Sequence, residues 1–190
     1  KKICLIDSNS KIGEKIKVSG GGKCNITNKF MSSSNFLGDT SFVEYNLNKF
    51  NEKDLLKYLN KNDLHPFINE KIVKGTYFCK TSKDVINMFN KLITNIDLKL
   101  NSQVLDVKYT DIFEIQCENK IIKSKKLIVA SGGKSYPIIG ASDIGFKIAE
   151  KFGHKIIRLD PALVGFTVQK DQFWFKDLSG LSIPVKITVN

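Results

Sequence analysis

Short apolar runs alternate with longer amphipathic stretches in the first half of this chain, and the alternation predicts an α/β fold. Residues 3–6 form an apolar run that ends at Asp7, which is typical of a buried parallel strand. Residues 51–62 and 83–95 repeat apolar positions at helical spacing, so each predicts a helix with one face in the core. Residues 81–84 provide an N-terminal cap for the second helix.

Extended segments dominate from residue 97 onward. Residues 97–100 predict a strand, and three later segments with short polar turns predict an antiparallel meander: 103–109, 112–118 and 120–123. The apolar run 127–130 predicts another buried strand. Residues 142–152 predict a helix that is capped by Ser142 and ended by Gly153. After Pro161 the pattern predicts strands again, at 163–169 and 181–189, which indicates a second domain beginning near Asp160.

Three consecutive glycines at positions 20–22 interrupt the packing pattern near the start of the chain. Glycine reaches positive φ and lets a ligand approach the backbone N–H groups, which together form an anion-binding concavity. Lys23 adds a positive charge, and Asn25 and Thr27 add short hydrogen-bonding side chains. The residues alone leave two interpretations open, a flexible surface loop and a cradle for a phosphate group.

The glycine segment is not a Walker A loop, because Lys17 stands where the first glycine should be and Cys24 replaces the hydroxyl residue. Asp7 suits a dinucleotide site better. In a βαβ unit of that kind, the acidic residue that closes the second strand accepts hydrogen bonds from a ribose hydroxyl. An Asp after a strand is also common in turns, so this placement alone does not decide its role.

Composition limits the remaining function classes. The 190 residues, 42% of them hydrophobic, can form one domain with a sizeable core. No apolar run approaches the roughly 20 residues of a membrane span, and a cytoplasmic protein is expected. The four cysteines lack the paired spacing of zinc sites or redox dithiols, so reduced thiols and no metal centre are expected.

The net charge of +11 raises the question of nucleic-acid binding. Arg158 is the only arginine, and the lysines are spread through every segment rather than gathered in one stripe. Because arginine is preferred for bidentate phosphate and base contacts, this distribution favours a lysine-rich surface that serves solvation. Nucleic acid is therefore a disfavoured partner.

Two long blocks resemble the BaiN/YhiN-type bacterial NAD(P)/FAD-dependent oxidoreductases. The first block runs from Ile6-Asp7-Ser8-Asn9 through Lys15 to Ser19-Gly20-Gly21-Gly22-Lys23-Cys24-Asn25-Ile26-Thr27-Asn28. The second is Ala130-Ser131-Gly132-Gly133-Lys134-Ser135-Tyr136-Pro137, followed by Gly140, Asp143, Gly145, Gly153-His154 and Pro161-Ala162-Leu163-Val164. A weaker match at residues 75–78 extends the similarity over nearly the whole chain, although over only part of the family's length.

The resemblance implies a Rossmann-like FAD-binding domain with an antiparallel meander over residues 1–160, and the start of a β-rich inserted domain over 161–190. It also implies that the sequence is truncated, without the N-terminal Gly-x-Gly-x-x-Gly turn or the C-terminal part. The first strand would then be missing from between residues 3–6 and 127–130, leaving unpaired edges. We expect such a fragment to be inactive and to bind FAD weakly.

The resemblance further implies which residues contact the cofactor. Val104, at the start of the meander, would meet the adenine through its backbone, and Asp7 would hold the ribose where the family commonly has Glu. The other expected contacts lie in the two matched blocks: Lys15, Ser19, Gly20, Gly21, Gly22, Lys23, Cys24, Asn25, Ala130, Ser131, Gly132 and Gly133. Proximity to Lys23 and the cradle is expected to lower the pKa of the Cys24 thiol.

The implied activity is that of an FAD-dependent oxidoreductase, which transfers hydride from NAD(P)H through the flavin to a small organic substrate. Two alternatives remain open. One is a tRNA-modifying flavoprotein, for which the lysines would have a use, and the other is a non-enzymatic basic nucleic-acid-binding module. No residues are assigned to catalysis from the sequence.

Overall fold

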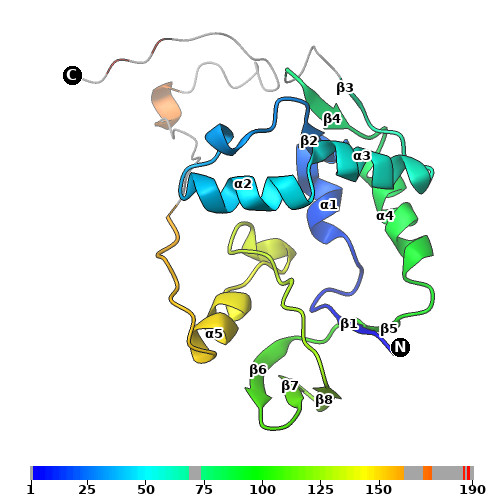
Figure 1. Cartoon of the computed structure of the whole chain (residues 1–190), viewed down its shortest axis with the longest axis vertical. Helices are drawn as coiled ribbons and strands as arrows, with labels where there is room; N and C mark the ends of the chain where they lie inside the picture. Colours follow the sequence, from blue (N-terminus) through cyan, green and yellow to red (C-terminus); the bar gives the residue numbers. More distant parts are fainter. Residues whose placement is uncertain (1, 69–73, 161–168, 173–185, 187, 189–190) are drawn as a thin grey trace. The chain divides into compact units, whose positions relative to one another are not determined.

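The computed structural model describes residues 2–68, 74–160, 169–172, 186 and 188. The chain divides into two units, Lys1–Lys155 and Ile156–Asn190, and each is described by itself. The first unit contains, in chain order, β1 (Cys4–Ile6), α1 (Glu14–Val18), the 3-10 helix η1 (Ser19–Gly22), β2 (Asn25–Asn28), η2 (Ser33–Asn35), α2 (Thr40–Lys49), α3 (Glu52–Lys61), β3 (Phe67–Ile68), β4 (Thr76–Phe78), α4 (Ser82–Leu92), β5 (Asp97–Lys99), β6 (Val104–Tyr109), β7 (Phe113–Cys117), β8 (Lys120–Ser124), η3 (Pro137–Ile139) and α5 (Ile144–Lys151) (Figure 1).

The second unit has one described element, η4 (Lys170–Gln172). The expected strands at 163–169 and 181–189 lie, apart from single positions, outside the described residues, so the β-rich domain stays a prediction. None of the described helices combines the length and the apolar character that a bilayer crossing requires.

Strand β1 pairs in parallel with β5, and Leu5 lies opposite Leu98. The long connection that parallel pairing requires includes α4, which directly precedes β5. The prediction of a parallel strand at residues 3–6 is confirmed. The prediction that it is buried is wrong, because no other described strand pairs with β1 and Ile3 remains 56% exposed.

Residues 127–130 do not form the predicted strand. They are assigned no secondary structure, and Ile128 is 89% exposed. A strand exists only where a neighbour accepts and donates its ladder hydrogen bonds, and no described segment does so here. The apolar pattern is therefore present without the pairing that would make it a strand.

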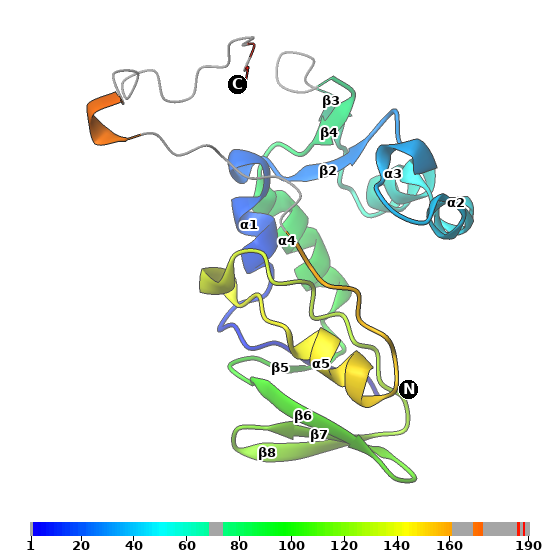
Figure 2. The same ribbon diagram turned by 90° about the vertical axis from the view of Figure 1, so that its left-hand side faces the viewer.

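A first core packs around α3 and α4 as their amphipathic patterns predict. It contains Cys24, Leu59, Leu64, Cys79, Val85 and Met88. Both helices are capped: the Thr81 hydroxyl accepts from the backbone N–H of Asp84 within the predicted cap, and the Asn51 side chain, which was not predicted as a cap, accepts from those of Lys53 and Asp54. α1 lies beside α4, as Figure 2 shows. Helix α4 ends at Leu92, three residues before the predicted end.

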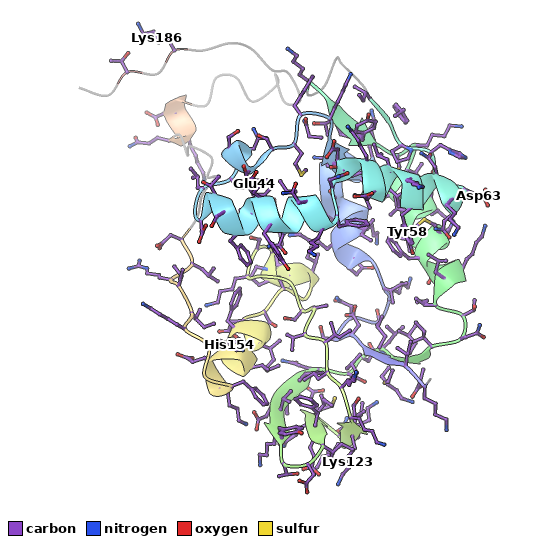
Figure 3. The ribbon with its side chains drawn as sticks, viewed as in Figure 1. Glu44, Tyr58, Asp63, Lys123, His154 and Lys186 are labelled. Atoms are coloured by element: carbon purple, nitrogen blue, oxygen red, sulfur yellow. The ribbon has the colours of Figure 1, made fainter. Side chains whose placement is uncertain are left out.

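The antiparallel meander is confirmed as a three-stranded sheet in the order β6-β7-β8 (Figure 2). Val107, Ile115 and Cys117 from this sheet and Ile148 from α5 form a second core. Lys123, labelled on β8 in Figure 3, forms an ion pair with Glu114 on β7 at 2.7 Å.

Helix α5 ends as predicted but begins later than predicted. Gly153 adopts φ +86°, the left-handed conformation that follows many helix ends. The N-cap is Asp143 instead of Ser142, and it makes no side-chain cap bond, because its carboxylate faces the ammonium of Lys147 at 3.0 Å. Neither α2 nor the short α1 was expected from the apolar pattern; α2 buries none of its residues.

Candidate functional site

The Asp7 carboxylate closes a tight turn at the C-terminal end of β1. Its Oδ1 accepts from the backbone N–H of Asn9 at 2.8 Å and from the Asn9 side-chain Nδ2 at 3.1 Å. The same Nδ2 lies 3.3 Å from the carbonyl oxygen of Ile139, to which it also donates. Asn9 thus ties the end of β1 to the segment after Gly133, at the strand end where open α/β sheets bind ligands.

The segment that leads into β6 lies beside Asp7. The backbone N–H of Ser102 donates to the Asp7 carbonyl oxygen at 3.0 Å, and that of Asn101 donates to the Asn9 carbonyl oxygen at 3.0 Å. Val104 follows two residues later as the first residue of β6. The fold therefore brings Asp7 and Val104 to one edge of the structure from positions far apart in sequence.

Lys15 joins the two matched blocks directly. Its ammonium lies 3.4 Å from the Ser135 carbonyl oxygen and 4.7 Å from the centre of the Tyr136 ring. Tyr136 is 68% exposed and adopts φ +65°, which is uncommon for a residue with a side chain. Both contacts hold the segment after Gly133 against the first turn of α1.

The Gly132-Gly133 turn leaves its backbone open. Gly132 has φ +72°, and a Cβ built on either glycine would meet no atom within 4 Å. Ala130 and Ser131 are exposed as well. Ser131 lies so close to Gly145 in the first turn of α5 that a side chain at position 145 would collide with its hydroxyl. Gly145 therefore lets the 130–133 segment lie directly on α5.

The three glycines form a left-handed turn after α1. Gly20, Gly21 and Gly22 have φ of +57°, +62° and +88°. The turn is closed by hydrogen bonds from Lys23 N to Gly20 O at 3.2 Å and from Cys24 N to Ser19 O at 3.0 Å. Lys23 and Asn25 are exposed, and Ser19 is half-buried.

Packing explains only the first of these glycines. A Cβ on Gly20 would collide with the Asn25 side chain, whereas one on Gly21 or Gly22 would meet nothing within 4 Å. The open space at Gly21 and Gly22 leaves their backbone accessible to a ligand. No hydrogen bond, ion pair or aromatic contact between described residues joins this turn to residues 130–133, so the two glycine turns are separate parts of the candidate site.

Cys24 is a core residue with 5% exposure, and the expectation of a lowered pKa is wrong. Burial raises the pKa of its thiol, although a hydrogen bond with Ser19 acts in the opposite direction. Cys79, in the same core cluster, has its pKa raised to about 11, chiefly by burial. Lys23 is exposed and is not among the causes of the shift in the Cys24 pKa. Cys24 therefore has a structural role, because it anchors the end of the glycine turn in the core.

The donor set fits a dinucleotide cofactor such as FAD. Asp7 offers a carboxylate for a ribose hydroxyl, the start of β6 offers backbone groups, and the two glycine turns offer accessible N–H groups. Asn9 and Tyr136 were missing from the predicted site. A short Asx side chain two residues after Asp7 is a signal for a local turn, but the tertiary contact of Tyr136 with Lys15 has no local signal.

An open groove of about 770 Å³ lies elsewhere, between the end of α3 and α4. Asp63, His65, Lys80 and Asn87 are among the residues that line it, and none of the predicted cofactor residues does. The described part of the chain contains no group of three or more His, Cys, Asp or Glu side chains that could hold a metal ion.

Comparison with known proteins identifies relatives of nearly the whole chain. "Ribosomal RNA dihydrouridine synthase" of Escherichia coli is 32% identical over 194 residues, which cover 99% of this chain and 48% of that protein. The protein of the same name from Haemophilus influenzae is also 32% identical, with 99% and 48% coverage. "3-Dehydro-bile acid delta(4,6)-reductase" of Clostridium scindens is 26% identical, covering 90% of this chain and 42% of its own.

The chain thus spans about half the length of these relatives. The resemblance to the BaiN/YhiN-type oxidoreductases holds at the level of the family, although the two relatives of higher identity are named for RNA modification. The family model of the HI0933-like protein Rossmann domain matches residues 1–181. With its Rossmann-type α/β architecture and its match over almost all residues, this chain belongs to the HI0933-like family of FAD-binding flavoproteins.

Proposed function

We propose that the whole protein is an FAD-dependent reductase that saturates a carbon–carbon double bond conjugated to a carbonyl group. One observation carries this proposal: the names of all three relatives describe the same bond change. Dihydrouridine arises from uridine by reduction of C5=C6, which is conjugated to the C4 carbonyl. A 3-dehydro bile acid with Δ4,6 unsaturation carries double bonds conjugated to its C3 carbonyl.

The reaction balances as a hydride and a proton added across the double bond. The hydride goes to the carbon remote from the carbonyl, the proton goes to the carbon beside it, and NAD(P)H is oxidised to NAD(P)⁺. FAD, when bound, would supply the hydride-transfer chemistry between the nicotinamide and the substrate. Asp7 would hold the adenosine ribose, the backbone at Val104 would meet the adenine, and the exposed backbone at Gly21, Gly22, Gly132 and Gly133 would accommodate the rest of the cofactor.

We propose a uridine in RNA as the substrate, in place of the small organic substrate that the family resemblance implies. The two relatives named for RNA modification have higher identity, at 32% against 26% for the bile-acid reductase. A net charge of +11 also suits a polyanionic substrate, because each neutralised phosphate releases counterions. A small enone remains the second candidate, supported by the bile-acid relative.

The test is a comparison of substrates with the purified full-length protein. Under anaerobic conditions, NADH or NADPH is supplied with either unmodified ribosomal RNA or a 3-oxo-4,6-diene steroid. We expect the flavin absorbance to bleach when the nicotinamide is added and to recover on addition of RNA. Mass spectrometry after nuclease digestion of the RNA should then show a uridine whose mass has increased by that of one H₂. Turnover of the steroid with no change in the RNA would support the second candidate. A protein that purifies without flavin, and that cannot be loaded with it, would overturn both.

A further inference from the structure

Phe30 is an exposed aromatic ring held in a fixed position at the end of the β2–β4 pair. Its side chain is 56% exposed, and its backbone N–H donates to Asn28 Oδ1 at 2.8 Å. A Cβ on Gly75 would lie 2.7 Å from the ring, so the glycine lets the ring rest on the backbone just before β4. An aromatic ring that is both exposed and positioned in this way loses little conformational entropy when another ring stacks on it.

Two lysines flank this ring, Lys29 directly after β2 and Lys74 shortly before β4. The ammonium of Lys29 lies 5.9 Å from the ring centre, and that of Lys74 lies 5.8 Å from it. Hydrogen bonds fix both backbones: Lys29 N donates to Gly75 O at 2.8 Å, and Asn28 Nδ2 donates to the Lys74 carbonyl oxygen at 3.1 Å. Neither ammonium forms an ion pair with a carboxylate of the described residues.

We propose that Phe30, Lys29 and Lys74 form a binding site for single-stranded RNA, with a nucleobase stacked on Phe30 and the adjacent phosphates on the two ammonium groups. This inference rests on the proposed RNA substrate and names a surface that holds it. An exposed aromatic ring among cations is the usual platform of single-strand binding, since every base has a face to stack and every nucleotide has a phosphate. A protein partner would be expected to need a broader apolar patch.

Among the residues that the structure describes, the other exposed aromatic side chains lack this combination. Tyr45 has a single lysine, Lys49, at 5.4 Å, and it lies on a helix that buries none of its residues. Phe50 is 55% exposed, almost the same as Phe30, and no lysine ammonium of the described residues lies over its ring. Phe50 is therefore a matched control for exposure without flanking charge.

The experiment measures binding of a fluorescein-labelled single-stranded RNA of about 15 nucleotides, within the usual site size of such proteins. Fluorescence anisotropy is recorded over a range of salt concentrations with the full-length FAD-loaded protein. We expect Phe30→Ala to weaken RNA binding by about 5- to 150-fold, Phe30→Trp to retain it, and Phe50→Ala to change it little. Lys29→Gln with Lys74→Gln should reduce the slope of log K against log salt by about 1.4, whereas Lys53→Gln with Lys57→Gln should not.

Equal losses of RNA affinity with Phe30→Ala and Phe50→Ala would overturn the site. A salt dependence of RNA binding that does not change with the Lys29 and Lys74 substitutions would overturn it as well. Failure of the site is distinguishable from failure of the proposed function. Wild-type protein that binds the labelled RNA and reduces uridine, with Phe30→Ala unaffected, leaves the function standing and removes only this surface. Wild-type protein that binds no RNA and reduces only the steroid removes the RNA substrate itself, and the site with it.

Discussion

The ammonium of Lys15 lies 4.7 Å from the centre of the Tyr136 ring and 3.4 Å from the carbonyl oxygen of the preceding residue. These contacts join the first turn of α1 to a segment more than a hundred residues later. The second glycine turn, Gly132-Gly133, precedes that segment directly, so Lys15 acts on the position of a backbone that we expect to contact the cofactor.

Lys15→Met should lower the FAD affinity of the full-length protein by about 3- to 10-fold, because one cation–π contact and one charged hydrogen bond are lost at an exposed site. Titration with FAD measures this effect. Lys17→Met is the matched control, since its ammonium is on the same short helix and lies 3.9 Å from Glu14. Tyr136→Phe keeps the ring and should bind FAD as the wild type does. Equal affinities for all three variants would contradict a positioning role for Lys15.

Asp7→Ala should weaken FAD binding by about tenfold or more, the usual effect of removing a hydrogen bond to a charged group. The same change also removes the turn that the carboxylate makes with Asn9. Asn9→Ala loses the side-chain bonds to Asp7 and Ile139, and it keeps both the carboxylate and its bond from the backbone N–H of residue 9. If Asn9→Ala reduces FAD affinity as much as Asp7→Ala does, then Asp7 acts only through the Asn9 side chain.

Gly22→Ala and Gly153→Ala form a matched pair. The two glycines have φ of +88° and +86°, and a Cβ on either would meet no atom within 4 Å. Both substitutions should therefore destabilise the protein by a similar amount, about 1–2 kcal/mol, through the left-handed backbone alone. Only Gly22→Ala should also weaken FAD binding, because only there do we expect a ligand to approach. Thermal unfolding and FAD titration measure the two effects separately.

Cys4 should be the first thiol to react with iodoacetamide in the folded protein. It is exposed, whereas Cys24, Cys79 and Cys117 are buried. With its pKa raised to about 11, Cys79 is a thiolate in on the order of one molecule in a thousand at pH 8. We expect the buried thiols to react at least about tenfold more slowly than Cys4, and at similar rates once urea is added. Peptide mass mapping over time identifies the order, and early labelling of Cys24 would contradict its burial.

The ion pair between Asp106 and Lys151 should make the folding stability of the protein depend on pH. Lys151 Nζ lies 2.6 Å and 2.7 Å from the two carboxylate oxygens, and this bond holds the Asp106 pKa below its usual range. The stabilisation is therefore present above the unfolded-state pKa of about 3.9 and is lost as the pH falls through the lower folded-state pKa.

Asp106→Asn should lower the urea midpoint slightly at pH 7, because the pair is exposed, and the difference from wild type should disappear in strong acid. Asp111→Asn, in the turn between β6 and β7, is the control for loss of a surface carboxylate, with no expected change. A difference that persists undiminished at the lowest pH would show that the ion pair is not its source.

Local signals in the sequence determined those helices and strands for which the hydrophobic pattern and the turn or capping residues indicate the same element. The meander of β6, β7 and β8 followed from alternating apolar positions, and α3 and α4 began at Asn51 and Thr81 because those side chains can accept bonds from the first helical N–H groups. The glycines at 20–22 likewise predicted the positive φ angles that the turn adopts, since glycine reaches positive φ without the cost that a Cβ imposes.

Only the tertiary structure decided features that depend on a distant neighbour. Residues 127–130 have the apolar pattern of a strand, but strand formation requires a hydrogen-bonded partner, and no described segment provides one. Cys24 stands next to a lysine in sequence, but its thiol lies in the core with Cys79, and burial raises the thiol pKa although a hydrogen bond with Ser19 acts in the opposite direction. The approach of Lys15 to Tyr136 and of Asp7 to the start of β6 arises from chain topology, because no local pattern records which residues the fold brings together.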